Sequence, residues 1–158
     1  MPTHSPLATL LRDTIQRELP QLRAAGPTRL DLHPNGPTSW SPKQELGHLI
    51  DSAANNHQRF VRAALESEYT GPGYAQDGWV ALHNYRNLPW ETLVTFWFEY
   101  NQLLAELIDN IPLNKLDTPC TIAAAQPVTL AFLIEDYVKH MQHHLDKILA
   151  RDVVTQYR

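Results

Sequence analysis

The chain has 158 residues, of which 43% are hydrophobic, and its formal net charge is -4 at pH 7. That length suffices for one compact domain with a core, and no shift in composition divides it, so we expect a single domain over residues 1–158. Acidic and basic residues are interspersed, which argues against nucleic-acid binding. The N-terminal segment does not resemble a secretory signal, and no apolar run approaches the roughly 20 residues that span a bilayer. We therefore expect a cytoplasmic protein without a membrane anchor.

The first predicted helix covers residues 6–25. Ser5 and Pro6 fit an N-cap and a first helical position, and leucine and isoleucine follow at helical spacing. Gly26 and Pro27 end this helix. The proline-rich segment that follows, up to Trp40, is expected to be an ordered but irregular connection.

The second predicted helix begins with a capping box. Ser41 and Gln44 have the spacing at which each side chain caps the other's backbone, and Pro42 occupies a position that needs no N–H donor. A polar row follows beside the apolar face, and it contains neither lysine nor glutamate, which favours the lining of a hydrated pocket over a solvated outer face. Its members are Gln44, His48, Ser52, Asn55 and Arg59.

Residues 68–89 are rich in glycine and aromatic side chains, and a loop of this length in a compact domain usually has a function. Its aromatic residues could cover the mouth of a pocket or pack on the outside of the helices, and the sequence does not decide between the two. The third helix is predicted from about Pro89 to Ile111. Hydrophobic residues occur on more than one of its sides, so it is either central or part of a subunit interface.

The segment 113–127 is predicted to be a crossover loop with one extended piece, and a fourth helix follows from about Val128. The only cysteine, Cys120, lies in this loop. It suits a reducing compartment and excludes an internal disulfide. A catalytic thiol there would need a basic neighbour or a helix start to lower its pKa, and neither is evident.

Two histidines on the fourth predicted helix indicate a metal site. His140 and His144 are four residues apart, so both imidazoles lean over one face of the helix. A catalytic zinc-type centre takes three protein ligands, and His48 in the second helix is the best third candidate. His143 points to the side. Met141 follows His140 where a metalloprotease motif would place glutamate, so that class of enzyme is excluded.

Three segments resemble the DinB-like superfamily, and most closely its YfiT-type metal-dependent hydrolases. They are WSPKQELGHLID from Trp40, the Y-x-x-D-x-W pattern from Tyr74 to Trp79, and YVKHMQHHL from Tyr137. The resemblance implies an all-α, four-helix bundle with up-down-down-up topology that is commonly a homodimer. It also implies one divalent metal per chain, often nickel or zinc, held by His48, His140 and His144.

The resemblance leaves the reaction open. A metal-dependent hydrolase is the first reading. Alternatives are transfer of a low-molecular-weight thiol on the same metal site, and a non-catalytic module that binds a metal or a small molecule. Asp51 and Asp136 each lie one turn from a metal histidine, and either could act as a general base or orient a ligand ring, with orientation or a structural role favoured. Arg59 and nearby aromatic residues suit a small-molecule substrate with an anionic or aromatic part.

Overall fold

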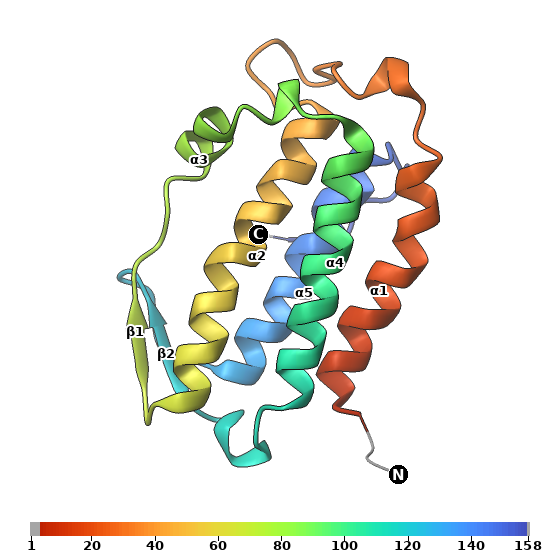
Figure 1. Ribbon diagram of the computed structural model, residues 1–158. Helices are drawn as coiled ribbons and strands as arrows, with labels where there is room; N and C mark the ends of the chain where they lie inside the picture. The colour runs from red at the N-terminus through yellow and green to blue at the C-terminus, as the bar shows by residue number, and fades with distance from the viewer. Residues whose placement is uncertain (1–3, 158) are drawn as a thin grey trace.

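The computed structural model describes residues 4–157, and these form five α-helices and a small sheet. Four long helices make the bundle: α1 (Pro6–Arg23), α2 (Pro42–Leu65), α4 (Trp90–Asp109) and α5 (Leu130–Ile148) (Figure 1). Each packs against two others, in the cyclic order α1, α4, α2, α5. The helical bundle predicted from the sequence is therefore confirmed. No helix within these residues is both long and apolar enough to cross a membrane.

Side-chain caps mark the starts of α2 and α5. The Ser41 hydroxyl accepts a hydrogen bond from the Gln44 backbone N–H at 3.3 Å, and the Ser41 backbone N–H donates to the Gln44 side chain at 2.9 Å. The predicted capping box is thus confirmed. At the start of α5, Thr129 accepts from the backbone N–H of Phe132 at 3.1 Å. This cap places the helix start at Leu130, two residues after the predicted position.

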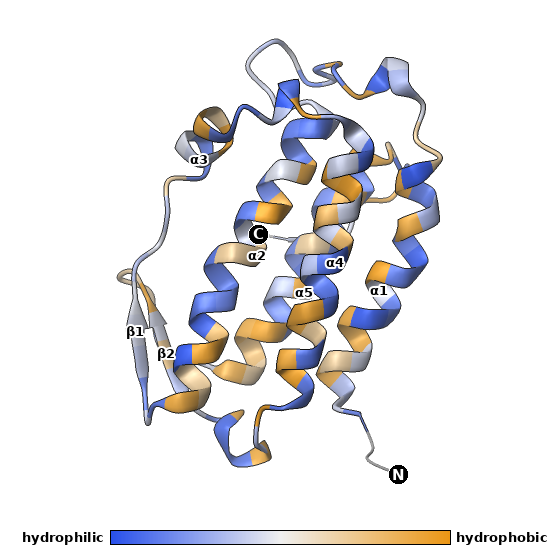
Figure 2. Cartoon of the chain, in the orientation of Figure 1, coloured by the Kyte–Doolittle hydropathy of each residue, from blue (hydrophilic) through white to orange (hydrophobic). Residues whose placement is uncertain are grey.

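The core is formed by the inward faces of the bundle helices. Hydrophobic and hydrophilic residues alternate in short blocks along each helix, as expected where one face is buried (Figure 2). Trp97 and Phe60 are the largest of the fully buried side chains. Asn101 is also fully buried, and it is satisfied because it accepts from the Tyr137 hydroxyl at 2.5 Å and donates to the Trp97 carbonyl at 2.8 Å.

A three-stranded sheet accompanies the helices, and one of its strands, Pro119–Ile122, is the extended piece predicted within residues 113–127. Strand β1 (Tyr69–Gly71) pairs in parallel with β2 (Pro119–Ile122), which pairs antiparallel with β3 (Val128–Thr129). The sheet ties the segment after α2 to the segment before α5. Cys120 lies on β2 and is fully buried, and burial raises the pKa of its thiol, so it is not an activated nucleophile.

The connection between α2 and α4 is more regular than a loop. It contains β1, the short helix α3 (Gln76–His83) and a 3₁₀ turn, Tyr85–Asn87; two other 3₁₀ turns cover Pro27–Arg29 and Leu113–Lys115. The Tyr85 ring rests directly on α2 at Gly47, where a Cβ would lie 2.0 Å from the ring atom Cδ2. Only glycine admits this close approach, which fixes the connection against the bundle.

Candidate metal centre

His48 lies on the second turn of α2 and points toward α5. The capping box at Ser41 fixes where the helix begins and so fixes the direction of the His48 side chain. That side chain is fully buried, with an exposed fraction of 0%. The Trp40 ring packs against it at a centroid distance of 4.7 Å. The imidazole is therefore held in one orientation inside the bundle.

His140 and His144 face His48 from α5. They lie one turn apart with ring centroids 4.5 Å from each other, and the His48 centroid lies 4.9 Å from that of His140 and 4.7 Å from that of His144. One ring nitrogen from each of the three residues lies within 4.8 Å of the other two. The structure thus brings together the three histidines that the sequence selected.

The distance between two of these nitrogens fits binding to one metal ion. The Nε2 atoms of His48 and His140 are 3.0 Å apart. Two nitrogens bound about 2.0–2.1 Å from one ion, at an angle of roughly 90–110°, lie about 3.0–3.4 Å from each other. Three imidazole donors suit a divalent transition metal and leave it open positions.

Burial keeps two of these histidines neutral. Burial lowers the pKa of His48 to about 4 and that of His140 to about 2, and the neighbouring imidazole of His144 acts in the same direction on both. A metal binds the neutral imidazole, so both rings have their lone pairs available near pH 7. Nδ1 of His48 is buried without a partner among the described residues, so the orientation of this ring depends on packing against Trp40.

Glu45 orients His144, and the sequence analysis missed it. Nδ1 of His144 lies 2.5 Å from Oε2 of Glu45, and the Lys147 ammonium lies 3.5 Å from the other carboxylate oxygen. Burial alone would raise the pKa of Glu45. The hydrogen bond with His144 and the nearby Lys147 ammonium outweigh burial, so the pKa of Glu45 is lowered. Such a carboxylate fixes the tautomer of a metal-binding histidine. The signal was present, since Glu45 lies three residues before His48 on the same helix.

A cleft of about 180 Å³ opens beside His140. Ser52 and Arg59 of the predicted polar row line it, as does Asn56. Gln44 instead forms the cap, and Asn55 donates to the backbone carbonyl of Asp51 at 2.9 Å. The prediction of a polar row along a pocket is thus right for part of the row.

A residue from the C-terminal segment forms one wall of this cleft. The Tyr157 ring packs on His140 at a centroid distance of 5.1 Å, and its hydroxyl donates to Asp136 at 2.8 Å. Thr155 anchors the segment by donating from its backbone N–H and its hydroxyl to Asp146, at 2.8 and 2.6 Å. His143 also contacts this segment, through the Thr155 carbonyl at 2.8 Å. No sequence pattern indicated that this segment folds back over α5.

Asp51 lies outside the histidine cluster. One of its carboxylate oxygens accepts from the Tyr85 hydroxyl at 2.6 Å and lies 2.9 Å from Nδ1 of His83. Burial raises the pKa of this carboxyl despite both contacts. Asp51 therefore holds the α2–α4 connection in place, and Glu45, not Asp51, is the carboxylate bonded to a cluster histidine.

The aromatic residues of the connection divide between two cavities. Tyr74 lines the cleft beside His140. Trp79, His83 and Tyr85 line a separate and largely apolar cavity of about 440 Å³, which Phe96 and Tyr100 of α4 close from the other side. Tyr74 therefore fits the first interpretation of this segment, and Tyr85, whose ring rests on α2 at Gly47, fits the second.

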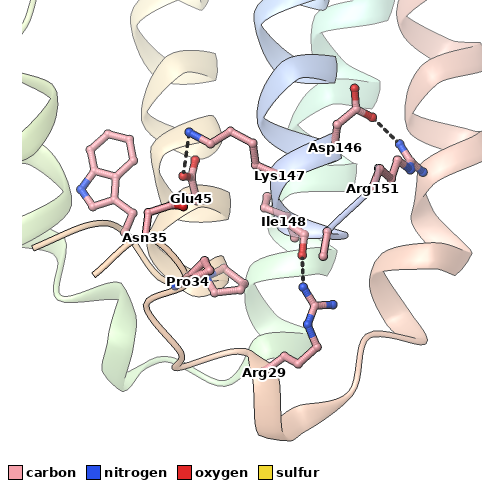
Figure 3. Close-up of a pocket in the computed structure, with 11 residues that line it drawn as sticks. Arg29, Pro34, Asn35, Glu45, Asp146, Lys147, Ile148 and Arg151 are labelled. Atoms are coloured by element: carbon pink, nitrogen blue, oxygen red, sulfur yellow. Dashed lines mark hydrogen bonds and ion pairs between the residues drawn. The ribbon is translucent and has the colours of Figure 1, made fainter. Parts of the chain in front are cut away.

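Another cavity, of about 330 Å³, lies on the Glu45 side of the cluster (Figure 3). Lys147 and Glu45 meet at its wall, and Arg29 donates to the backbone carbonyl of Ile148 at 3.1 Å. Arg151 pairs there with Asp146 at 2.7 Å. These charged groups already have partners, and none of the three cluster histidines lines this cavity.

Comparisons with known proteins agree with this architecture. The family model of the DinB superfamily matches residues 10–148. The fold is similar to the solved structure of YfiT from Bacillus subtilis, described as a probable metal-dependent hydrolase with an unusual four-helix bundle topology. That likeness has a TM-score of 0.80 and 20% sequence identity, and it covers 92% of this chain and 84% of YfiT. No curated protein matches the sequence.

Proposed function

The chain belongs to the DinB superfamily, and from this premise we propose that it is a metal-dependent enzyme whose divalent ion is held by His48, His140 and His144. The convergence of three imidazole nitrogens within 4.8 Å, beside a cleft that His140 lines, carries the proposal. Hydrolysis is the reaction we propose first, because YfiT, whose fold this chain shares, is described as a probable metal-dependent hydrolase.

The residues around the cluster have distinct parts in this proposal. A bound divalent ion would supply Lewis-acid chemistry, polarising a carbonyl oxygen and acidifying water. Glu45 holds His144 in the tautomer that presents Nε2 to the ion. Trp40 covers His48 and keeps solvent from that side. Substrate would therefore enter from the cleft, where Ser52, Asn56 and Tyr157 offer polar groups beside His140.

Two other readings share the same residues. A low-molecular-weight thiol could bind at the open position, which would make the protein a thiol transferase, or the site could hold a metal or small molecule without turnover. The cleft beside His140 favours an enzyme over a purely structural metal site, because structural zinc sites are closed by four ligands. Nickel or zinc is the proposed ion, since both accept imidazole donors.

We further propose the up-down-down-up order of the helices in a single domain. The path of the chain in Figure 1 supports it, since the connection through β1 and α3 returns to the end of the bundle where α2 began, and α4 starts there. We also propose a cytoplasmic homodimer. Phe96 and Leu103, two turns apart on α4 and each 53% exposed, support a subunit contact. A sedimentation mass of one chain at micromolar concentration would contradict it.

Elemental analysis by plasma mass spectrometry tests the metal site. We expect about one nickel or zinc per chain in untagged protein, and loss of most of it in His48→Ala, His140→Ala and His144→Ala. The loaded protein is then assayed with ester, amide and thiol-transfer substrates. Turnover that disappears with the metal supports an enzyme, and the substrate type separates hydrolysis from thiol transfer. Failure to bind nickel or zinc after incubation would refute the proposal.

A further inference from the structure

The cleft beside His140 adjoins a second and larger cavity. The neighbouring space measures about 410 Å³ and lies between α5 and the sheet. Arg59, Leu133 and Asp136 line both spaces. A molecule in the cleft can therefore extend past these three residues, away from the histidines.

The two spaces differ in chemical character. Polar side chains predominate in the cleft beside His140. Apolar side chains line much of the second space, namely Ile122, Val128, Phe132 and Leu133. A ligand that fills both must combine a polar reactive end with an apolar group.

Arg59, at the junction, is a half-buried cation without an ion-pair partner among residues 4–157. Its guanidinium donates to the Asn56 side chain at 3.5 Å and to the Pro72 carbonyl at 3.2 Å, and it lies 6.0 Å from the centre of the Tyr74 ring. All of these acceptors are neutral. Four other arginines, namely Arg12, Arg17, Arg23 and Arg151, each pair with a carboxylate, whereas Arg29 donates to the Ile148 carbonyl.

This arrangement leaves donors of Arg59 for a ligand. A guanidinium has five N–H groups in a planar fork that matches a carboxylate, and the contacts above use two of its nitrogens. The Asp136 carboxylate at the same junction already accepts from Tyr157. The unused N–H groups of Arg59 can therefore bind an anion at this junction.

We propose that the substrate carries a carboxylate or similar anion that binds Arg59, an apolar group that fills the cavity between α5 and the sheet, and a reactive bond directed toward His140. The inference rests on the proposed metal site, because His140 marks the reactive end of the cleft. Arg59 is then a specificity-determining residue.

Isothermal titration calorimetry with hexanoate and hexanamide tests this inference on zinc-loaded, full-length protein. The two probes share the apolar chain and differ in charge. We expect wild type to bind hexanoate more tightly than hexanamide. We expect Arg59→Met to lose about tenfold or more of its hexanoate affinity and little of its hexanamide affinity, as for a charge-assisted bidentate pair. The hexanoate affinity of Arg59→Lys should lie between those of wild type and Arg59→Met, because lysine keeps the positive charge but lacks the planar fork of donors.

Arg62→Met is the matched control, since Arg62 is exposed on the same helix and lines neither cavity. It should bind both probes as wild type does. Unchanged hexanoate affinity in Arg59→Met, or no hexanoate binding to wild type, would overturn the inference. Hexanoate affinity that survives Arg59→Met and disappears in His140→Ala would place the anion on the metal, which overturns the role of Arg59 but not the metal site. Zinc content, measured on the same samples, reports separately on the proposed function.

Discussion

Two buried polar clusters lie three residues apart on α2, and they are built in opposite ways. In the cluster of His48, nitrogen atoms converge on one another, and the carboxylate of Glu45 contacts His144 from outside. In the cluster of Asp51, donors from Tyr85 and His83 converge on one carboxylate oxygen. The first presents several lone pairs to a point where a cation fits. The second supplies donors to one oxygen of its carboxylate, and the other oxygen is buried without a partner among the described residues.

This difference shows why proximity in sequence did not identify the orienting carboxylate. Asp51 lies one turn from His48, yet it faces the α2–α4 connection. Glu45 also lies one turn from His48, on the other side along the helix, and it faces α5. Both residues are acidic and buried, so only the packing of neighbouring elements separates a structural carboxylate from one that acts on the site.

The two clusters should respond to acid in opposite directions. Burial lowers the pKa of His48 from 6.5 to about 4, so the unfolded chain binds more protons between these values and stability falls as the pH falls through them. For metal-free protein, this residue alone should remove on the order of 3 kcal/mol of unfolding free energy between pH 7 and pH 4. Urea unfolding followed by circular dichroism at several pH values measures the change.

Variants of the two clusters separate their contributions. Burial raises the pKa of Asp51, so its contribution to stability is full below its ordinary value of 3.8 and falls as the pH rises through the folded value. His48→Ala should therefore flatten the rise of stability with pH, and Asp51→Asn should steepen it. If the unfolding free energy depended on pH in the same way for wild type and both variants, neither His48 nor Asp51 would titrate as its surroundings imply.

Gly47→Ala should damage the Asp51 cluster selectively. The new Cβ would lie 2.0 Å from Cδ2 of Tyr85, so the ring must move away from α2 and from Asp51. We expect a loss of about 2 kcal/mol of unfolding free energy, as for an overpacked core site, with metal content retained. Gly26→Ala is the control, because nothing lies within 4 Å of its new Cβ. Equal stability of the two variants would mean that Tyr85 does not rest on α2 as described.

Glu45→Gln should weaken metal binding without removing it. The neutral amide still accepts a hydrogen bond from His144 but does not stabilise it by charge. Loss of such an outer partner typically costs roughly 10–100-fold in metal affinity, and we expect about tenfold here because the hydrogen bond remains. Competition with a chromophoric zinc chelator gives the dissociation constant. Asp51→Asn is the paired variant and should leave zinc affinity unchanged; a loss as large as that of Glu45→Gln would contradict the separation of the clusters.

Local sequence signals predicted much of this architecture. The Ser41 capping box fixed the start of α2, and a four-residue spacing placed His140 and His144 on one face of α5, because both depend only on residues within one or two helical turns. The pairing of Tyr69 with Cys120 joins strands 51 residues apart in sequence, and both strands are too short to show an alternating pattern. The pairing of these strands was therefore not predictable from either segment alone, although an extended piece was predicted within residues 113–127.

The residues that complete the candidate site were harder to predict for the same reason. Glu45 contacts His144 only because α2 and α5 pack with a particular relative rotation, which helical periodicity does not specify. Tyr157 reaches His140 because Asp146 anchors Thr155, a contact between a helix and an irregular segment. Local patterns thus gave the three histidines, and tertiary packing determined what surrounds them.

Tyr85→Phe is the smallest of these changes to the Asp51 cluster. It removes one donor from Asp51 and keeps the ring over Gly47, so packing is retained. We expect a loss of about 1 kcal/mol of unfolding free energy, typical of one buried hydrogen bond, and unchanged zinc affinity. Tyr137→Phe is a matched control, because it removes another buried tyrosine hydroxyl, bonded to Asn101 in the core, and should cost a similar amount. If Tyr85→Phe alone also weakened zinc binding, the Asp51 cluster would be coupled to the histidines through α2, and the two clusters would have to be treated as one site.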